Sequence, residues 1–442
     1  MDSYIESFFT GLGREERRRA LGWYVTGLLL DGERKSIEPI AARLVESADE
    51  IEAMRQRLQQ AVSVATWSET EVYRRLALRL ESELPGVEAL VFDDTGFPKK
   101  GTHSVGVARQ YSGTLGRVDN CQVATSLHLA GQAGSGCIGM RLYLPEEWTK
   151  DRERCAAVGV PENLEFIPKW KIALDLVDAA ISWGVHKHVV LGDAAYGDVT
   201  EFRKELTKRD LKYLLAVQGT LVVWESGTGP KPPPPRKPGR SGRMPTKYTD
   251  GKQAPVSIEA LAKKIGRRAY AKVKWREGAR GVQSSYFAAV RVRTAHRHTH
   301  GEPPSEEQWL LCEWPKNEPQ PTKSYLSTLS DRTPIKKLVR FAKLRWRIER
   351  DYQEMKGEVG LDHFEGRTWR GFHHHAALCA VAHGFLALRR ALSPPEDCTV
   401  DAPNSPTRPA AGAAEEDRDV PALSPAIRAA GGRCGGLAYV IG

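Results

Sequence analysis

The chain has 442 residues, and its 65 Lys and Arg residues outnumber its 55 Asp and Glu residues, which gives a formal net charge of +10. This length allows two or three domains, and the positive charge favours a polyanionic partner, although many basic proteins bind no nucleic acid. The seven cysteines include no CxxC pair, which argues against a zinc ribbon. No run of 18 apolar residues occurs, which argues against a membrane span. Because the start of the chain also has no signal-peptide pattern, we expect a cytoplasmic protein.

Residues 1–85 are predicted to form several short helices joined by tight turns. The segment 14–30 is amphipathic with a basic start, Ser36 is placed to cap the next helix, and Ser68 and Glu71 have the spacing of a capping box. Short helices with Arg and Lys on their exposed faces are typical of DNA-binding modules. The alternative is a helical interaction domain whose charges are only solvated.

Residues 86–220 are predicted to form a mixed α/β unit, because apolar strand-like runs surround an amphipathic helical pattern. We expect strands at Ala89–Phe92, Asn120–Leu129, Cys137–Leu144, Lys187–Leu191 and Lys212–Val217, and a helix at Phe166–Trp183. Three strands, a helix, a strand, a helix and a strand is the order of the ribonuclease H-like fold.

Acidic residues follow two of these strands. Asp93 and Asp94 come directly after the first strand, and Asp193 closely follows the fourth. Strand geometry alone does not decide between Asp93 and Asp94. Asp198 competes with Asp193, but it is also placed to cap the next helix. Carboxylates at the ends of two strands, together with a Glu from a later helix, form a triad that is able to hold two Mg²⁺ ions.

Residues 221–330 are predicted to form a β-rich insertion. The stretch Gly227–Pro245 is too rich in Pro for regular structure. Strand-like runs follow it at Ala271–Trp275, Ser285–Arg293 and Trp309–Glu313. The insertion therefore lies between the fifth strand of the α/β unit and the next long helical pattern.

Residues 331–392 are predicted to form two helices. The first extends from Thr333, which is placed to cap it, to Lys356. Arg345, Glu349 and Lys356 share one face of this helix, because they are separated by four and seven residues. A carboxylate flanked by two cations suits a metal ion and phosphates. The alternative is a solvated face with one ion pair between Arg345 and Glu349.

The second of these helices carries three consecutive histidines, His373, His374 and His375. Consecutive residues point in different directions on a helix, so we expect these side chains to pack or to contact phosphate rather than to converge on a metal. The tail, residues 393–442, is rich in Ala, Pro and Gly and is expected to be disordered, with no catalytic role.

The sequence RWRIE ends at Glu349 and is followed by Lys356, and the stretches FDDTGFPKKG, GVARQYSGTLG, NCQVA and LDHFEGR occur elsewhere in the chain. Together these motifs resemble one branch of the bacterial insertion-sequence transposases of the Asp-Asp-Glu superfamily, which carry a Tyr-Arg-Glu-Lys signature. The Tyr position of the signature falls on Ala342, with Phe341 beside it. The resemblance spans residues 10–390.

This resemblance implies an α/β protein with a ribonuclease H-like catalytic core, a β-rich insertion and an N-terminal helical DNA-binding domain. The family pattern Asp-x-Thr after the first strand favours Asp93 over Asp94. Glu349 is preferred to Glu354, because only Glu349 has Arg four positions before it and Lys seven after it. The implied catalytic triad is Asp93, Asp193 and Glu349, which would bind Mg²⁺, with Mn²⁺ as a substitute.

The resemblance also implies a set of DNA contacts. Arg345 and Lys356 would hold phosphates. Trp309 begins a Trp-Leu-Leu strand that matches the strand whose indole, in a relative, stacks on a base flipped out at the transposon end. The alternative is that Trp309 is a core residue. Trp346 lies beside the catalytic Glu349 and is a further candidate for DNA contact.

The function implied is that of a DNA transposase, which cleaves both ends of an insertion sequence and joins them to target DNA. The partners would be double-stranded DNA, namely the terminal inverted repeats and the target, and a second copy of the chain on DNA. Such a protein would be cytoplasmic and associated with the nucleoid. Two alternatives stay open: a catalytically silent DNA-binding protein derived from a transposase, and a ribonuclease H-like nuclease without strand transfer.

Overall fold

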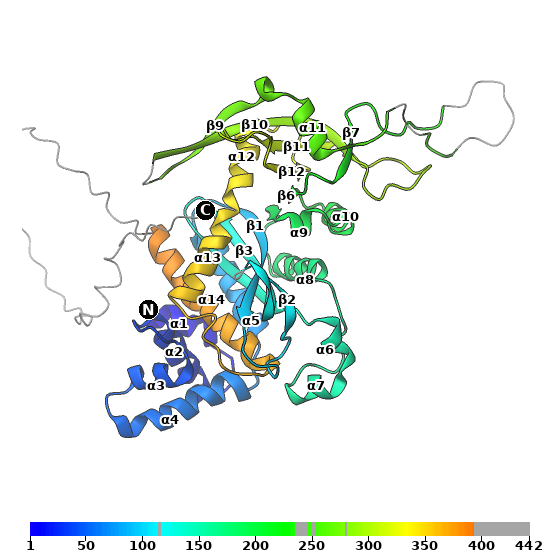
Figure 1. The fold of residues 1–442 in the computed structure, drawn as a ribbon. Coiled ribbons are helices and arrows are strands. Elements are labelled where there is room, and N and C mark those ends of the chain that lie inside the picture. Colours follow the sequence, from blue (N-terminus) through cyan, green and yellow to red (C-terminus); the bar gives the residue numbers. More distant parts are fainter. Residues whose placement is uncertain (114–115, 235–245, 250, 252, 279–280, 393–442) are drawn as a thin grey trace, which may run out of the picture.

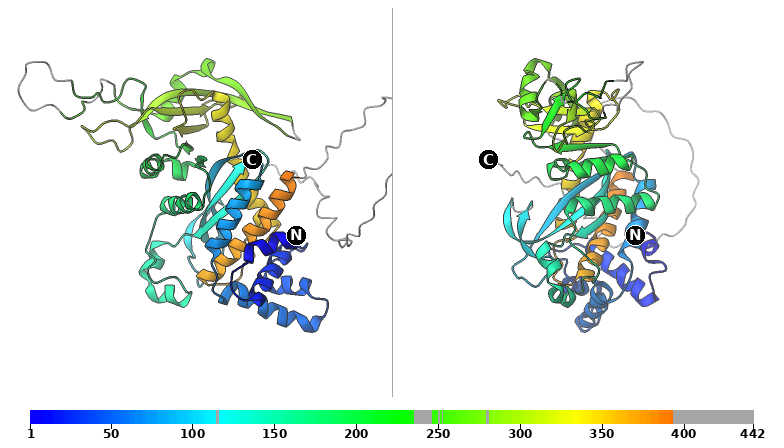
Figure 2. Two further views of the ribbon diagram at one scale, coloured as in Figure 1. Left: turned by 180° about the vertical axis from the view of Figure 1, so that it is seen from behind. Right: turned by 90° about the vertical axis from the view of Figure 1, so that its right-hand side faces the viewer.

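The computed structural model describes residues 1–113, 116–234, 246–249, 251, 253–278 and 281–392. Its helices and strands form a central α/β core, with the N-terminal helices at one end and the insertion at the other (Figures 1 and 2). The predicted disordered tail and most of the Pro-rich stretch lie outside the described residues. Within the described ranges, no helix has both the length and the apolar character needed to cross a membrane.

The first 85 residues are helical, as predicted. The helices are α1 Asp2–Phe9, α2 Glu15–Leu29, α3 Ile37–Leu44, α4 Ala48–Gln59, a π-helical turn at Gln60–Val64 and α5 Glu69–Glu83. Ser68 caps α5, because its hydroxyl accepts a hydrogen bond from the Glu71 amide at 3.1 Å. Ser36 occupies the N-cap position of α3, but its side chain makes no capping hydrogen bond.

These N-terminal helices pack against the last helix of the core, α14 Trp369–Leu392. The Tyr4 hydroxyl of α1, for example, donates to the Val381 carbonyl at 3.0 Å. Buried apolar side chains from α1, α2 and α5 belong to the same hydrophobic cluster as those of the core. The division at residue 85 and the DNA-binding role of residues 1–85 therefore stay predictions, and the helices also have a structural role.

The core contains the five predicted strands and a sixth that the sequence did not predict. The strands are β1 Val87–Pro98, β2 Ala108–Ser112, β3 Arg117–Gly131, β4 Ser135–Leu142, β5 Val189–Gly192 and β6 Tyr213–Val217. β1, β5 and β6 pair in parallel, and β3 pairs with β1, β2 and β4 in antiparallel fashion. The extra strand, β2, is short and mostly not buried, so its apolar pattern is weak.

Helices cover both faces of this sheet. Between β4 and β6 lie α6 Glu146–Lys150, α7 Arg152–Ala157, α8 Lys169–Ser182, α9 Ala194–Gly197 and α10 Thr200–Lys208. The Phe92 ring of β1 packs edge-to-face on Phe202 of α10, which places α10 on one face. The opposite face is covered by α5, α14 and the helix that precedes α14, which all contact β4 (Figure 1).

The insertion extends the core sheet. Its elements are β7 Val222–Glu225, β8 Val256–Ser257, α11 Ile258–Lys264, a 3₁₀ turn at Arg267–Ala269, β9 Ala271–Gly278, β10 Gly281–Thr294, β11 Gln308–Glu313 and β12 Lys323–Ser327. β12 pairs antiparallel with β6, so the strands of core and insertion form one sheet in the order β2-β3-β1-β5-β6-β12-β11-β10-β7-β8. The sequence predicted β9, β10 and β11, but not the shorter strands β7, β8 and β12.

The prediction of one uninterrupted helix from Thr333 to Lys356 is wrong. The structure has two consecutive helices, α12 Ile335–Leu344 and α13 Trp346–Gly357, which meet at Arg345. The backbone of Arg345 has φ −53° and ψ −27°, and the Ile348 amide bonds to the Arg345 carbonyl in a 3₁₀-type turn. Thr333 also makes no cap, because α12 begins after Pro334. Apolar periodicity continues through the junction, so it could not reveal the break.

Candidate active site

The pairing of β1 and β5 sets the positions of the first two predicted carboxylates. Val91 of β1 lies opposite Leu191 of β5 in the parallel register. Asp93 and Asp193 each follow two residues later, so they emerge level with each other at the carboxyl ends of neighbouring strands. The sequence predicted both acidic positions, and the register supplies the reason that they meet.

Asp93 and Asp94 point to opposite faces of the sheet. Asp94 is held by three side chains: the Tyr196 hydroxyl at 2.7 Å, the Thr125 hydroxyl at 2.8 Å and the Lys169 ammonium at 2.9 Å. Asp93 lies on the face covered by α13 instead, and its Oδ2 atom lies 3.0 Å from the Arg345 guanidinium. The geometry thus brings Asp93, and not Asp94, to the helix that carries Glu349.

Asp193 is the N-cap of the short helix α9. Its carboxylate accepts hydrogen bonds from the amides of Ala195 at 3.0 Å and Tyr196 at 3.4 Å. Burial raises the pKa of Asp193, and the charge of Asp94 adds to this effect, whereas Arg345 opposes it. Its sequence competitor, Asp198, instead accepts from the Gln218 amide at 2.9 Å.

Arg345 joins the predicted triad into one cluster. At the junction of α12 and α13, its guanidinium bonds both to Asp93 and to Glu349. Burial lowers the pKa of this guanidinium, but Asp93, Glu349 and then Asp193 outweigh burial and raise it. Two carboxylates therefore contact one fixed cation, and the third, Asp193, interacts with it through its charge. The side chain of Glu349 is 59% exposed, whereas that of Asp93 is 17% exposed, so the cluster opens to solvent at Glu349.

Asp93 is the most perturbed member of the cluster. Its pKa is raised to about 7, chiefly by burial; Arg345 lowers the pKa, and the charges of Asp193 and Asp94 add to the rise. A carboxyl group near neutrality is typical of a site where several acids are held together. The side chains of the predicted triad offer only carboxylate oxygens, which is the ligand type that Mg²⁺ and Mn²⁺ prefer. The residues present thus fit the predicted metal.

Lys356 lies on α13 seven residues after Glu349, on the same helical face, as predicted. Its Nζ atom donates to the Gly96 carbonyl of β1 at 2.8 Å and sits 5.2 Å from the centre of the Phe97 ring. Burial lowers the pKa of Lys356. The structure therefore places Lys356 against β1, three residues beyond Asp93, rather than within the carboxylate cluster.

The two predicted tryptophans lie in different surroundings. Trp309 is half-buried in β11, its indole N–H donates to the Ser330 carbonyl at 2.9 Å, and the Arg291 guanidinium lies 5.0 Å from its ring. Trp346 is the first residue of α13 and borders a small cavity of about 90 Å³ together with Trp275 of the insertion. Trp309 thus belongs to the insertion and Trp346 borders it, and a DNA-contact role for either stays a prediction.

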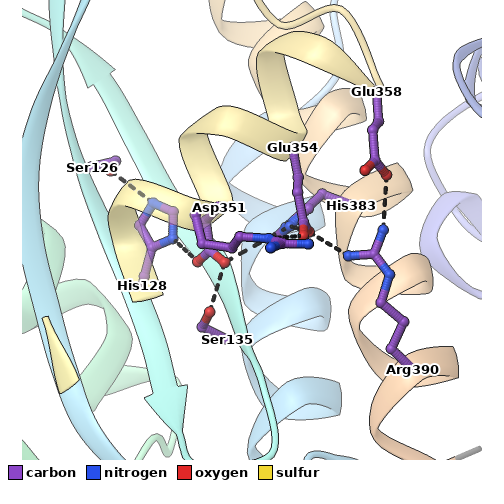
Figure 3. Close-up of polar contacts among 9 residues, drawn as sticks. Ser126, His128, Ser135, Asp351, Glu354, Glu358, His383 and Arg390 are labelled. Carbon is purple, nitrogen blue, oxygen red and sulfur yellow. Dashed lines mark hydrogen bonds and ion pairs between the residues drawn. The ribbon is translucent and has the colours of Figure 1, made fainter. Parts of the chain in front are cut away.

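A buried chain of hydrogen bonds, which the sequence did not predict, begins at the backbone of Asp93 and leads away from the carboxylate cluster. The Tyr352 hydroxyl donates to the Asp93 carbonyl at 3.0 Å and lies 2.6 Å from the Ser126 hydroxyl. Ser126 lies 2.9 Å from His128 Nε2, and His128 Nδ1 lies 2.6 Å from Asp351 (Figure 3). Tyr352 and Asp351 come from α13, so the chain ties the helix that carries Glu349 to the strands β1 and β3.

The direction of these bonds fixes the protonation of His128. Because Tyr352 donates its only proton to the Asp93 carbonyl, Ser126 must donate to Tyr352 and accept from His128 Nε2. Asp351 accepts from Nδ1, so both ring nitrogens carry protons and His128 is an imidazolium. Burial lowers the pKa of His128, but Cys137 and Asp351 outweigh this effect and raise the pKa to about 10.

The same network continues to α14. Asp351 also accepts from the Ser135 hydroxyl at 2.6 Å, and His383 lies 3.3 Å from Glu354, which pairs with Arg390 (Figure 3). Burial raises the pKa of Glu354, but the bonds from His383 and its arginine partners outweigh this and lower it to about 2. Glu354, the sequence competitor of Glu349, is therefore a structural anion. Polar residues among the buried positions of α13 were the signal that could have revealed this network.

The three consecutive histidines are buried packing residues, one of the two roles predicted. Two of the rings bond to backbone carbonyls through one nitrogen each: His373 Nδ1 to Trp369, and His375 Nε2 to Gly360 and Leu361. The two nitrogens of His374 lie near the Val62 and Trp67 carbonyls, and the neutral ring donates to one of them. Burial lowers the pKa of each imidazole to about 4. These histidines are neutral at physiological pH and anchor α14.

Comparison with known proteins gives two matches. A family model described as "DDE superfamily endonuclease" matches residues 7–282, which is more than half of the chain. The "probable transposase for insertion sequence element IS701" of Microchaete diplosiphon is 30% identical over 202 residues, which cover 45% of this chain and 48% of that relative. The chain thus aligns with about half the length of this curated relative.

Proposed function

Because the chain belongs to the DDE superfamily of endonucleases, we propose that it is a DNA transposase, which cleaves the ends of an insertion sequence and joins them to target DNA. The observation that carries this proposal is that Asp93 and Asp193 lie level at the carboxyl ends of two parallel strands, while Arg345 bonds to both Asp93 and Glu349. The similarity to a probable insertion-sequence transposase supports transposition over other endonuclease functions.

In this proposal Asp93, Asp193 and Glu349 hold Mg²⁺, with Mn²⁺ as a substitute. When bound, these ions activate the nucleophile and stabilise the leaving oxygen of a phosphodiester. The protein contributes a rigid site: β1 and β5 fix the two aspartates, and the Tyr352 hydrogen bond fixes α13 relative to β1. Asp93 must lose its proton to act as a ligand, and its raised pKa makes this step sensitive to pH near neutrality.

Arg345 has two roles in the proposed mechanism. Without bound cations it neutralises Asp93 and Glu349, which would otherwise repel each other. Once these carboxylates have other positive partners, its five N–H donors are able to hold a DNA phosphate in bidentate fashion. Lys356 would approach the DNA backbone from the β1 side of the same helix.

The proposed partners are the terminal inverted repeats and the target DNA. The net charge of +10 favours such a polyanion, and residues 1–85 carry exposed Arg side chains on α2, for example Arg19, whose side chain is 66% exposed. Concerted cleavage of two ends requires at least a dimer on DNA. The protein would act in the cytoplasm, bound to the nucleoid.

The test uses labelled DNA from either flank of the gene and a supercoiled target plasmid. The full chain should cleave the end DNA and join it to the plasmid only with Mg²⁺ or Mn²⁺. Asp193→Asn and Glu349→Gln should lower both activities by at least about 10³-fold, since about 4 kcal/mol of transition-state stabilisation would be lost, yet still bind DNA.

The matched control is Glu358→Gln, because Glu358 is a half-exposed carboxylate that also pairs with an arginine but lies beyond α13. This variant should retain both activities. Robust cleavage by Glu349→Gln would refute the assignment of the triad. Cleavage without joining would favour a nuclease, and end binding without cleavage by the unaltered chain would favour a silent DNA-binding protein.

A further inference from the structure

A second group of metal-ligating side chains lies outside the carboxylate cluster. Glu81 of α5 meets His186 and His188, which precede β5. Glu81 Oε1 lies 2.5 Å from His186 Nδ1 and 2.9 Å from His188 Nε2, and Oε2 lies 3.0 Å from His188 Nε2. One ligand atom from each residue falls within a group whose members are all within 4.8 Å of one another.

The backbone between the two histidines brings their rings together. The His188 amide donates to the His186 carbonyl at 2.8 Å, which closes a tight turn at Lys187. The Lys187 ammonium is directed elsewhere and donates to the Arg209 carbonyl at 2.9 Å. Both imidazoles are thereby left on the side of Glu81, so the convergence is built into the backbone and does not depend on long flexible side chains.

We propose that Glu81, His186 and His188 form a binding site for a divalent transition-metal ion of the Zn²⁺ class. Two imidazole nitrogens and one carboxylate oxygen are ligands that suit Zn²⁺, and three protein ligands leave a fourth position for water. Glu81 and His188 are 12% and 15% exposed, whereas His186 is 80% exposed. Glu81 and His188 therefore form the buried side of the site, and the side of His186 is open to solvent, so that an ion is able to enter there.

This site is distinct from the carboxylate cluster in position and in chemistry. His188 lies just before β5, and Asp193 lies just after it, so the two are about 16 Å apart at about 3.3 Å per residue. The carboxylate cluster offers only oxygen atoms, which suit Mg²⁺, whereas this group is mainly nitrogen and selects against Mg²⁺.

The bound ion would fasten α5 to β5. Glu81 is more than 100 residues from both histidines in sequence, so one ion would close a long loop between the N-terminal helices and the strand that leads to Asp193. Hydrogen bonds between a carboxylate and two imidazoles already join these elements. An ion would replace their protons with coordinate bonds and raise the stability of the folded chain in proportion to its affinity.

The experiment measures Zn²⁺ binding to the chelator-treated full chain in excess Mg²⁺, by competition with a chromophoric chelator, and Co²⁺ binding by its visible absorption. We expect one equivalent of Zn²⁺ to bind tightly and to raise the Tm. The visible absorption of bound Co²⁺ should be that of an ion with four or five ligands. His186→Ala, His188→Ala and Glu81→Gln should each weaken binding about tenfold or more and remove the rise in Tm. His186→Ala alters a mostly exposed side chain, so this variant should fold even if the others do not.

Three controls make the outcome decisive. His103→Ala and His300→Ala alter exposed histidines elsewhere and should bind like the unaltered chain. Glu349→Gln should also bind normally, because the proposed site is separate from the carboxylate cluster. Undiminished tight binding by His186→Ala, or its loss in Glu349→Gln or His300→Ala, would overturn the proposal. Absence of tight Zn²⁺ binding by the unaltered chain would also overturn it, and Glu81, His186 and His188 would then only hold α5 and β5 together by hydrogen bonds.

Discussion

The charged pair of His128 and Asp351 gives a quantitative prediction about stability. The side chains are 0% and 4% exposed, and their nitrogen and oxygen atoms are 2.6 Å apart. A pKa that rises from the ordinary 6.5 to about 10 corresponds to about 5 kcal/mol of extra stabilisation of the imidazolium. Part of this comes from Cys137, and the removal of one partner from a buried pair costs about 3–5 kcal/mol. We therefore expect Asp351→Asn to cost about 4 kcal/mol at pH 6.5.

The cost should depend on pH in a defined direction. A pKa raised by folding stabilises the protein fully below the unfolded pKa of 6.5, and this stabilisation is lost as the pH rises toward about 10. The difference between the unaltered chain and Asp351→Asn should therefore shrink by about 3 kcal/mol between pH 6.5 and pH 9, at about 1.4 kcal/mol per pH unit.

The assay is a set of thermal unfolding curves at several pH values. An unfolding entropy of about 2 cal/mol/K per residue gives about 0.9 kcal/mol/K for this chain, so a loss of about 4 kcal/mol lowers the Tm by about 4–5 °C if the chain unfolds as one unit. Ser135→Ala is the matched control, because it removes the 2.6 Å bond to the same carboxylate but leaves both charges. Its cost should not change with pH. An equal cost of Asp351→Asn at every pH would show that His128 is neutral and would refute the reasoning.

Two further predictions concern DNA cleavage. Because the pKa of Asp93 is raised to about 7, the cleavage rate at limiting Mg²⁺ should fall about tenfold per pH unit below that value. Arg345→Ala should move this fall to higher pH, since Arg345 lowers the pKa of Asp93. A pH–rate profile that is flat from 5.5 to 8 would contradict this. Trp309→Ala should slow the formation of a DNA hairpin by about 10- to 100-fold but spare the first nick, because base stacking contributes about 1–3 kcal/mol. Gel time courses separate the two products, and melting curves give the Tm. Equal slowing of both products together with a lower Tm would mark Trp309 as a packing residue that holds Ser330.

The sequence was most informative where one local signal decided the outcome. The apolar runs that end at Asp93 and near Asp193 predicted β1 and β5, and parallel pairing then brings the two carboxylates level. Helical spacing put Glu349 and Lys356 on one face of α13. The existence of the two strands and the shared helical face depend on neighbours within one element, which a pattern of residues records directly, whereas the level placement of the two aspartates comes from strand pairing.

Pairings between residues far apart in the chain were not predictable, even where a buried polar residue signals that it needs a partner. His128 is one polar residue in a buried strand, and its partner Asp351 is 223 residues away. Glu81 and His188 are 107 residues apart, and neither gives a local signal of its own. The short strand β12 is recognisable only because it pairs with β6 and so joins the insertion to the core. In each case tertiary contacts decide the role of the residue.

The break between α12 and α13 connects the fold to the proposed chemistry. Three carboxylates at one place repel one another, and burial raises the pKa of both aspartates, so the site needs a cation even before any metal binds. Arg345 supplies this cation at the junction of the two helices, where its guanidinium reaches Asp93 on β1 and Glu349 on the next turn. The junction also lets α12 run toward the insertion while α13 packs on the core (Figure 1). Arg345 is thus both the residue at which the helix direction changes and the cation that balances the carboxylates. The helical pattern predicted its partner Glu349, which depends only on spacing, but not the break, which depends on contacts with the core and the insertion.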